Sequence, residues 1–302
     1  MLIGVCLDPG RPWSDVRRLG QLADDAGLAT VYAPDHFMAY APADAPASTD
    51  PVLECWTMLT ALAALTRRVR LTTLVLGATY RHPAVVANMA ATLDHVADGR
   101  LTLGLGAGWQ QNEHTAYGIE LPPVRQRLDR FEESTRVIRA LLSGGSVDFD
   151  GTHFQLADSR CDPIPLQQPL PLLVAGAGER RTIPIAARLG DAWHAWADPS
   201  EFRRKSAVLD EACSVAGRDP ASVRRLTGQV LLVTTDGTDG TDASAEDDDD
   251  VVGSAPWVGD RLASYREAGV DEFIIRDHRA TPMGDIARSL EIVAVDLAPH
   301  LR

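Results

Sequence analysis

Short apolar runs alternate with longer amphipathic segments along most of the chain. The apolar runs have the length of buried strands and span residues 2–6, 30–33, 70–76, 101–106, 172–175, 192–195, 226–234 and 272–276. The segments between them have the length and pattern of helices and span residues 13–26, 54–66, 84–96, 128–142, 182–189, 201–216, 261–268 and 286–297. Eight successive strand–helix units indicate an α/β protein whose parallel strands close into a (β/α)8 TIM barrel.

Local chemistry supports several of these boundaries. Ser14 precedes an apolar helical face, and Gly27 stands where such a helix ends. Pro83 suits the first turn of a further helix. The unbroken apolar run at 101–106 is typical of a parallel strand that is covered on both faces.

Three longer stretches, at 35–51, 107–125 and 143–171, interrupt the alternation. The third contains the sequence GTHF, which suits a small hairpin. In a barrel, the segments that leave the carboxyl ends of the strands build the active-site face. We therefore expect one domain over residues 1–302, with insertions at that face.

The charge of the chain is unevenly distributed. The formal net charge is −13, from 29 basic and 42 acidic residues, and eight of the acidic residues lie between 234 and 250. Such a run cannot bury a core, so an acidic, mobile insertion is expected over 234–256. Elsewhere no basic cluster suited to nucleic acid is visible.

Other protein classes find no support in the sequence. No apolar run approaches the roughly 18–20 residues of a membrane span, and the first residues lack the features of a signal peptide. We therefore expect a cytoplasmic enzyme without a membrane partner. The cysteines, which we expect to be reduced, and the histidines show no metal-ligand spacing, so no metal site is predicted. A G-x-S-x-G nucleophile motif is absent.

Two glycine clusters follow predicted strands. In GLGAGW, at 104–109, and in GAGERR, at 176–181, the spacing does not fit the dinucleotide-binding fingerprint G-x-G-x-x-G. Both clusters suit either tight turns or the close approach of a ligand to the backbone. In the second cluster, free backbone amides, Arg180, Arg181 and a helix start near Thr182 suit a phosphate. The alternative is that one or both arginines pair with surface carboxylates.

Asp35 and His36 directly follow the second predicted strand. An imidazole is suited to proton transfer near neutral pH. A histidine after a strand can also be purely structural. The neighbouring aspartate and the position at the expected active-site face make His36 the candidate catalytic residue.

Four segments resemble the luciferase-like monooxygenase superfamily, particularly its branch that uses the deazaflavin coenzyme F420. They are APDHF (33–37), LECWTMLTALAALTRRVRLTTLV (53–75), YRHPAVVANMAATLDHVADGRLTLGLGAGWQQNEHTAYGIELPP (80–123) and AGAGERRTIPIAARLGDAW (175–193). The resemblance implies a bacterial luciferase-like barrel with a flavin or deazaflavin against the strand carboxyl ends.

The resemblance also implies roles for individual residues. Asp35 and His36 would lie beside the cofactor ring, and Leu74-Val75 would form a bulge behind it, often with a non-prolyl cis peptide. The ring and its ribityl chain would contact Ala107, Gly108 and Asn112, and the phosphate would contact Gly176, Ala177 and Gly178. Trp109 departs from relatives that oxidise glucose 6-phosphate, which have an acidic residue at that position.

Three functions remain open from the sequence. The leading hypothesis is an F420-dependent oxidoreductase that moves a hydride between the deazaflavin and a small organic substrate. The second is an FMN-dependent monooxygenase that uses reduced flavin and O2, and the third is a non-catalytic flavin-binding barrel. Arg180 and Arg181 favour F420, because its acidic tail continues beyond the phosphate. A homodimer is also left open.

Overall fold

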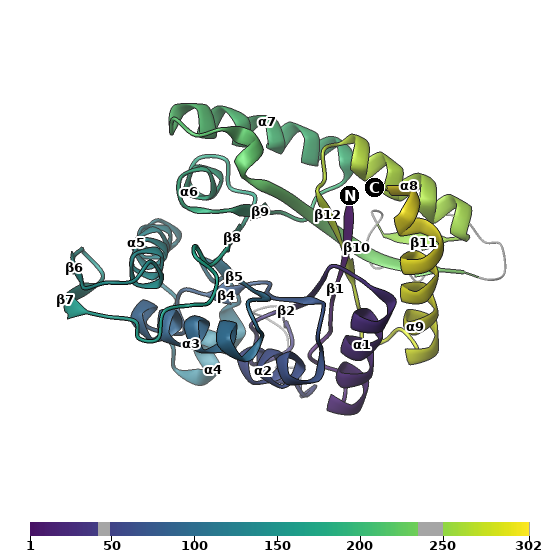
Figure 1. Cartoon of the computed structure of the whole chain (residues 1–302), viewed down its shortest axis with the longest axis horizontal. Helices are drawn as coiled ribbons and strands as arrows, with labels where there is room; N and C mark the ends of the chain where they lie inside the picture. The colour runs from purple at the N-terminus through teal and green to yellow at the C-terminus, as the bar shows by residue number, and fades with distance from the viewer. Residues whose placement is uncertain (42–48, 235–249, 302) are drawn as a thin grey trace.

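Eight parallel strands close into a barrel in the computed structural model, which describes residues 1–41, 49–234 and 250–301 (Figure 1). In chain order they are β1 (Leu2–Cys6), β2 (Thr30–Ala33), β3 (Arg70–Thr73), β5 (Leu101–Gly106), β8 (Leu172–Ala175), β9 (Ala192–His194), β10 (Arg224–Val233) and β12 (Glu272–Arg276). Closure occurs where β1 pairs with both β12 and β2. The predicted (β/α)8 barrel is confirmed.

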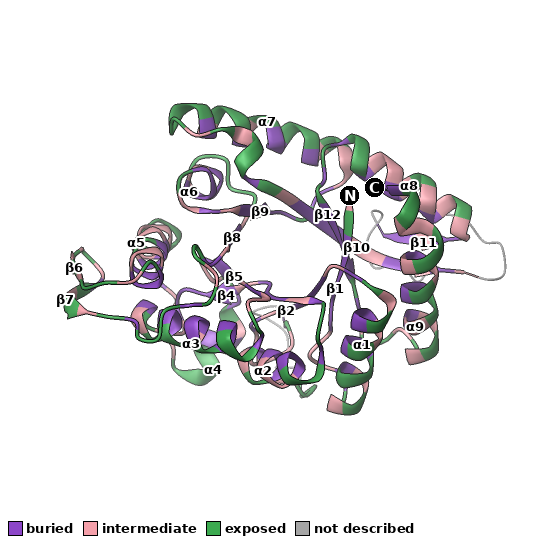
Figure 2. Cartoon of the chain, in the orientation of Figure 1, coloured by how far each residue is buried: buried purple, intermediate pink, exposed green. Residues whose placement is uncertain are grey.

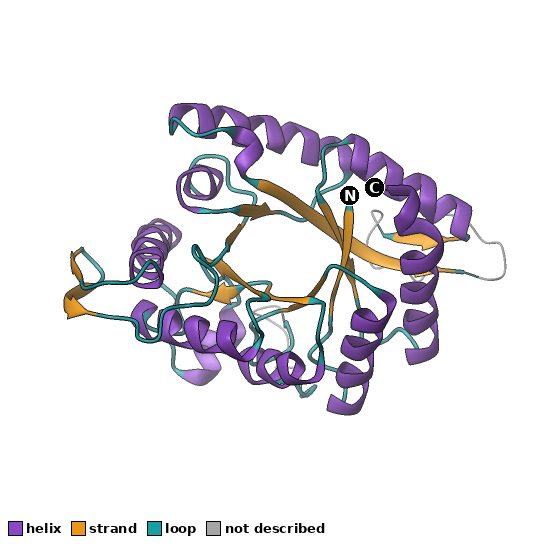
Figure 3. Cartoon of the chain, in the orientation of Figure 1, coloured by secondary structure: helices purple, strands orange, loops and turns teal. Residues whose placement is uncertain are grey.

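Helices surround the strands (Figure 3). They are α1 (Trp13–Ala26), α2 (Cys55–Leu65), α3 (Pro83–Val96), α4 (Gln111–Tyr117), α5 (Val124–Leu142), α6 (Thr182–Leu189), α7 (Pro199–Val215), α8 (Ala255–Glu267) and α9 (Met283–Ile292). Short helical turns occupy Pro220–Ser222, Val293–Leu297 and Ala298–Leu301. As predicted, α1 ends at Gly27, with φ 78°, and Pro83 lies in the first turn of α3.

Two apolar layers hold the barrel together. Residues on the inner faces of the strands, among them Tyr32, Leu173 and Ile274, form a small cluster inside it. A larger cluster fills the space between the strands and the helices and includes Val5 and Leu103. The strands are therefore covered on both sides, as their continuous apolar runs indicated (Figure 2).

Four features differ from the sequence prediction or add to it. The predicted strand 70–76 is split into β3 and β4 (Leu76–Gly77) around a cis peptide bond between Leu74 and Val75. The expected loop at 107–125 contains α4. The starts of α5 and α8 precede the predicted ones, because a proline just before or within the first turn begins a helix there. The hairpin around GTHF is confirmed as β6 (Val147–Asp150) and β7 (Gln155–Ser159).

The acidic insertion predicted over 234–256 needs a correction at its end. Residues 235–249 lie outside the described residues. Val251–Gly253, however, form β11, which pairs in parallel with the end of β10, and α8 begins at Ala255. The last residues of the predicted insertion therefore form a short strand beside the end of β10 and the start of α8.

Candidate active site at the barrel mouth

His36 lies just after β2, at the carboxyl ends of the strands, and its ring is held by a buried carboxylate. Its Nδ1 is 2.8 Å from Oε1 of Glu113 in α4, and the Glu113 side chain is fully buried whereas that of His36 is 27% exposed. A carboxylate can only accept here, so Nδ1 donates. In neutral His36 the other ring nitrogen, Nε2, then carries no proton and is free to accept one.

Glu113 is the centre of a larger network. Its Oε2 accepts from the backbone N–H of Phe37 at 2.7 Å and of Met38 at 3.3 Å, and its Oε1 also accepts from the hydroxyl of Tyr80. Burial alone would raise the pKa of Glu113, but the hydrogen bonds from His36, Tyr80 and Phe37 outweigh it and hold that pKa below its ordinary value. Glu113 is therefore an anion that fixes the His36 loop.

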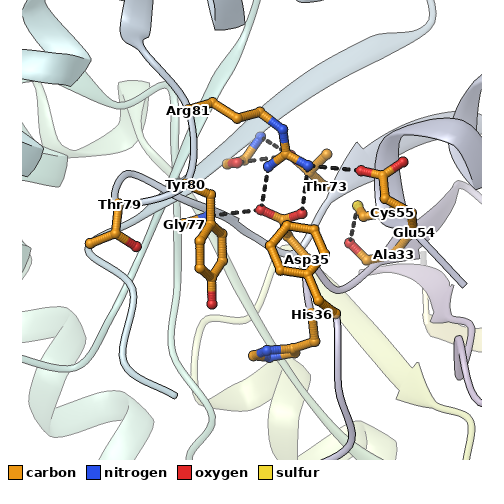
Figure 4. A network of polar contacts seen from close by, with 12 residues as sticks. Ala33, Asp35, His36, Glu54, Cys55, Thr73, Gly77, Thr79, Tyr80 and Arg81 are labelled. Atoms are coloured by element: carbon orange, nitrogen blue, oxygen red, sulfur yellow. Dashed lines mark hydrogen bonds and ion pairs between the residues drawn. The ribbon is translucent and has the colours of Figure 1, made fainter. Parts of the chain in front are cut away.

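Asp35, the residue before His36, faces the protein interior. Its fully buried carboxylate binds Arg81 through two contacts, of 2.7 and 3.1 Å, and accepts from the N–H of Gly77 at 3.1 Å. Arg81 also reaches Glu54 at 2.7 Å. In Figure 4 the Asp35 carboxylate faces Arg81 and Gly77, whereas the His36 ring lies away from them. Asp35 thus fastens the loop after β2 to the loop after β4.

The bulge between β3 and β4 determines why β5 contains glycines. The Leu74–Val75 peptide bond is cis, as the resemblance implied. A Cβ on Gly104 would lie 1.8 Å from the carbonyl oxygen of Thr73, and one on Gly106 would lie 2.6 Å from Cγ2 of Val75. The close approach expected at these two glycines is therefore to the bulge of the neighbouring strand.

The segment after β5 carries the predicted contacts Ala107, Gly108 and Asn112. Ala107 and Gly108 are half-buried, and Gly108 has φ 80°. The Asn112 amide donates to the carbonyl of Ala39 at 3.0 Å, while its Oδ1 is buried and has no hydrogen-bond partner in the described part of the chain. This acceptor, next to Glu113 in α4, is one that a bound ligand with a donor would satisfy.

The glycine loop after β8 presents its backbone to solvent. Three successive carbonyls point inward: Gly176 accepts from Nε1 of Trp193 at 3.0 Å, Ala177 from Nζ of Lys205 at 3.1 Å, and Gly178 from the N–H of Ile183 at 3.0 Å. In a planar trans peptide the following N–H points the opposite way. Within the described residues the N–H groups of Ala177, Gly178 and Glu179 have no acceptor, so they are available to an anion, as in a nest.

The charged residues around this loop differ from the expectation. Arg181 is bound to Asp129 at 2.7 Å and lies 3.5 Å from Glu132, so the surface-carboxylate alternative holds for it. Arg180 is exposed, and within the described ranges it has no ion-pair partner. Lys205 of α7, which the sequence analysis did not single out, is the buried cation under the loop.

Other polar groups complete the mouth. His194, at the end of β9, is buried, and burial lowers its pKa to about 3, so it stays neutral.

In the described part of the chain, no cluster of three or more His, Cys, Asp or Glu side chains is arranged to hold a metal ion. Nor does any described helix have the length and apolarity that a membrane crossing requires.

The structure thus brings the predicted site residues to one end of the barrel but divides their roles. His36 and Asn112 lie at the mouth, and Gly176 to Gly178 form the outward loop, whereas Asp35 is turned inward. Sequence reasoning missed Glu113, Tyr80, Arg81 and Lys205 as site residues. For Glu113 a signal existed, because it lies in the polar run Asn112-Glu113-His114 at the same predicted face.

Comparison with known proteins places these features in a family. The family model for luciferase-like monooxygenases matches residues 3–247. An F420-dependent glucose-6-phosphate dehydrogenase of Kineococcus radiotolerans is 39% identical over 172 residues, which cover 57% of this chain and 49% of that protein. The pyrimidine monooxygenase RutA of Allorhizobium ampelinum is 34% identical over 194 residues, which cover 62% of this chain and 51% of that protein. The chain therefore spans about half the length of these relatives.

The solved structures give the same fold. The coenzyme F420-dependent tetrahydromethanopterin reductase from Methanopyrus kandleri superposes with a TM-score of 0.84 at 18% identity, over 100% of this chain and 99% of that chain. At this identity the likeness shows the fold alone. Together with the match over most of the sequence, it establishes that the chain belongs to the luciferase-like monooxygenase family.

Proposed function

We propose that this protein is an F420-dependent oxidoreductase that transfers a hydride between the deazaflavin and a small organic substrate. The observation that carries the proposal is the shared location of a held imidazole, His36, and an outward-facing backbone loop, Gly176 to Gly178, at one end of the barrel. The similarity to an F420-dependent dehydrogenase supports the choice of cofactor.

The phosphate of the cofactor would bind at the glycine loop. Its outward amides and the positive end of α6 suit an anion. A side chain at Gly176 would fill this cradle, since a Cβ there would lie 2.7 Å from Cγ2 of Thr182. The residues present therefore fit a phosphate-bearing ligand.

The ring of the cofactor would lie between this loop and His36, over the bulge at Leu74 and Val75. Ala107, Gly108 and Asn112 would line one side, with the orphaned Oδ1 of Asn112 accepting from the ligand. Asp35 would act indirectly, by holding the loop that carries His36. We assign it a positioning role rather than direct contact.

Once bound, the deazaflavin supplies two-electron transfer to or from a carbon atom. The chain supplies position and proton handling. His36 is held through Nδ1, so its Nε2 takes the proton from a substrate hydroxyl as the carbon is oxidised, and returns it in the reverse direction. The Glu113 carboxylate stabilises the imidazolium that forms.

The direct test is a pair of absorbance titrations, with F420 and with FMN, on the same preparation. The proposal expects tighter binding of F420, since Arg180 is available to the acidic tail that FMN lacks. An exposed charge contributes only about 0–1 kcal/mol, so the preference from Arg180 is modest and falls with added salt. The Arg180→Ala variant should reduce the difference in affinity between F420 and FMN. Arg17→Ala, which changes an exposed arginine of α1, should leave that difference unchanged.

The second candidate is an FMN-dependent monooxygenase that uses reduced flavin and O2. The similarity to the pyrimidine monooxygenase RutA favours it. Tighter binding of FMN, with O2 consumption by the reduced complex, would replace our proposal by this one. Binding of either cofactor without turnover of any substrate would instead favour a non-catalytic flavin-binding barrel.

A further inference from the structure

Arg276 stands at the carboxyl end of β12, on the strand face that points into the barrel. Side chains alternate along a strand, so residues 272, 274 and 276 share one face. Glu272 on this face accepts from the hydroxyl of Tyr32 at 2.8 Å, and Ile274 packs in the cluster inside the barrel. Arg276 is the next residue on that face and is exposed, so its guanidinium lies at the mouth.

The side chain of Arg276 makes no ion pair within the described residues. Three other arginines near the strand ends are paired: Arg11 with Asp277, Arg81 with Asp35, and Arg279 with Asp50. For Arg276 neither an ion pair nor a hydrogen bond from the side chain occurs in the parts of the chain that the structure describes. A guanidinium can bind a planar oxyanion through two parallel hydrogen bonds, and that capacity is free here.

Strand register places Arg276 near the proposed reaction centre. Cys6 of β1 pairs with Tyr32 on one side and with Arg276 on the other. Those two residues therefore stand at one level of the barrel, two strand spacings or about 10 Å apart. His36 lies four residues after Tyr32, at the same end of the barrel. Arg276 and His36 therefore lie at one mouth, after strands β12 and β2, which only β1 separates.

Besides the Glu113 carboxylate, aromatic side chains lie next to His36. Trp109, 56% exposed, lies edge-on to the His36 ring at 5.7 Å and packs against Tyr40, 62% exposed, at 5.4 Å between ring centres. Large exposed aromatic side chains next to a reactive group suit a flat, apolar ligand. Arg81, the neighbouring cation, is committed to two carboxylates.

We propose that the substrate is an organic anion with a flat, apolar body, whose acidic group binds Arg276 while its body lies along Trp109. This inference rests on the proposed function, because it takes His36 as the place where the reacting carbon lies. It assigns substrate recognition to two residues that form no part of the phosphate loop.

The test measures binding of three probes, benzoate, phenyl phosphate and benzyl alcohol, by calorimetry, with and without bound F420. Benzoate or phenyl phosphate should bind wild type about 10- to 100-fold more tightly than benzyl alcohol, as expected for hydrogen bonds to a charged group. Whichever anion binds more tightly shows whether the acidic group of the substrate is a carboxylate or a phosphate. Arg276→Gln should abolish the difference, and Arg276→Lys should restore part of it.

Two further variants separate the contributions. Arg279→Gln removes a paired charge three residues away and should leave the preference unchanged. Trp109→Ala should weaken all three probes alike, by about tenfold or less. Equal binding of the anions and the alcohol by wild type, or a preference that survives Arg276→Gln, would overturn the inference.

The outcome is independent of the cofactor assignment. If F420 fails to bind but the anion preference depends on Arg276, the proposed function falls and the anion site stands. If F420 binds and no preference is found, only the anion site falls.

Discussion

The two ends of the proposed cofactor site are built from different materials. Around His36 the work is done by buried side chains: Glu113 alone accepts from the imidazole, a phenol hydroxyl and two backbone amides. Around Gly176 to Gly178 the site consists of exposed backbone, whose carbonyls accept hydrogen bonds from Trp193, Lys205 and Ile183. One end fixes a single ring in one orientation, and the other leaves several donors open.

This difference follows from what each end has to do. A proton-transfer group must be held at hydrogen-bond distance from the reacting atom. A buried charged partner holds it there, although burying that charge costs free energy of desolvation. A phosphate site must be reachable and must offer several hydrogen-bond donors to the anion. We therefore expect substitutions at the His36 end to change kcat, and those at the loop to change cofactor affinity.

The largest effect is expected from His36→Ala. Loss of a positioned acid–base group should lower kcat by about 10²–10⁴-fold while the Kd for F420 changes little. Steady-state kinetics and a cofactor titration measure the two quantities. His82→Ala, at the exposed start of α3, is the matched control and should leave both unchanged. Loss of cofactor binding with a normal single-turnover rate would make His36 a binding residue only.

Glu113→Gln tests the support behind His36. By analogy with carboxylates that orient metal-bound histidines, kcat should fall about 10- to 100-fold. Because hydrogen bonds hold the pKa of Glu113 below its ordinary value, its anion stabilises the folded state fully above about pH 4.3 and loses this effect as pH falls through the folded-state pKa.

The stability difference between wild type and Glu113→Gln should therefore be largest near pH 7 and narrow toward pH 3, as measured from denaturant midpoints. Glu120→Gln, an exposed neighbour, should show no such difference. If the stability difference between wild type and Glu113→Gln stayed constant from pH 7 to pH 3, this would contradict the assignment of Glu113 as an anion.

Gly176→Ala tests the backbone end. Gly176 has φ 139°, and a Cβ would lie 2.7 Å from Thr182, so the loop must shift. Strain of this kind costs about 1–3 kcal/mol, and we expect cofactor affinity to fall about tenfold with little change in single-turnover rate. Gly217→Ala has the same sign of φ, at 68°, without a close neighbour, and should lower Tm but not affinity.

Lys205→Met should give the smallest effect. It removes the hydrogen bond to the Ala177 carbonyl, which is worth about 1 kcal/mol, or about fivefold in cofactor Kd. Arg203→Met removes an equal charge from an exposed position of α7 and should leave the Kd unchanged. If both variants weaken binding equally, the effect is one of net charge and the loop does not depend on Lys205.

The sequence by itself determined much of the architecture. Unbroken apolar runs predicted strands buried on both faces, and their alternation with helices predicted the barrel. The same alternation put Asp35, His36 and both glycine clusters at strand ends, because every strand of such a barrel points one way. Gly27 marked the end of the first helix, where its φ of 78° is one that few other residues adopt.

Only the tertiary structure decided which of these residues act together. His36 and Glu113 are 77 positions apart, and Asp35 and Arg81 are 46 apart; no local pattern encodes either pair. The pairs form because barrel closure brings the loops after β2, β4 and β5 to one edge. Each buried charged side chain then pairs with an oppositely charged side chain that closure of the barrel places next to it. For the same reason Arg181 pairs with Asp129, whereas Arg276 has no ion-pair partner among the residues that the structure describes.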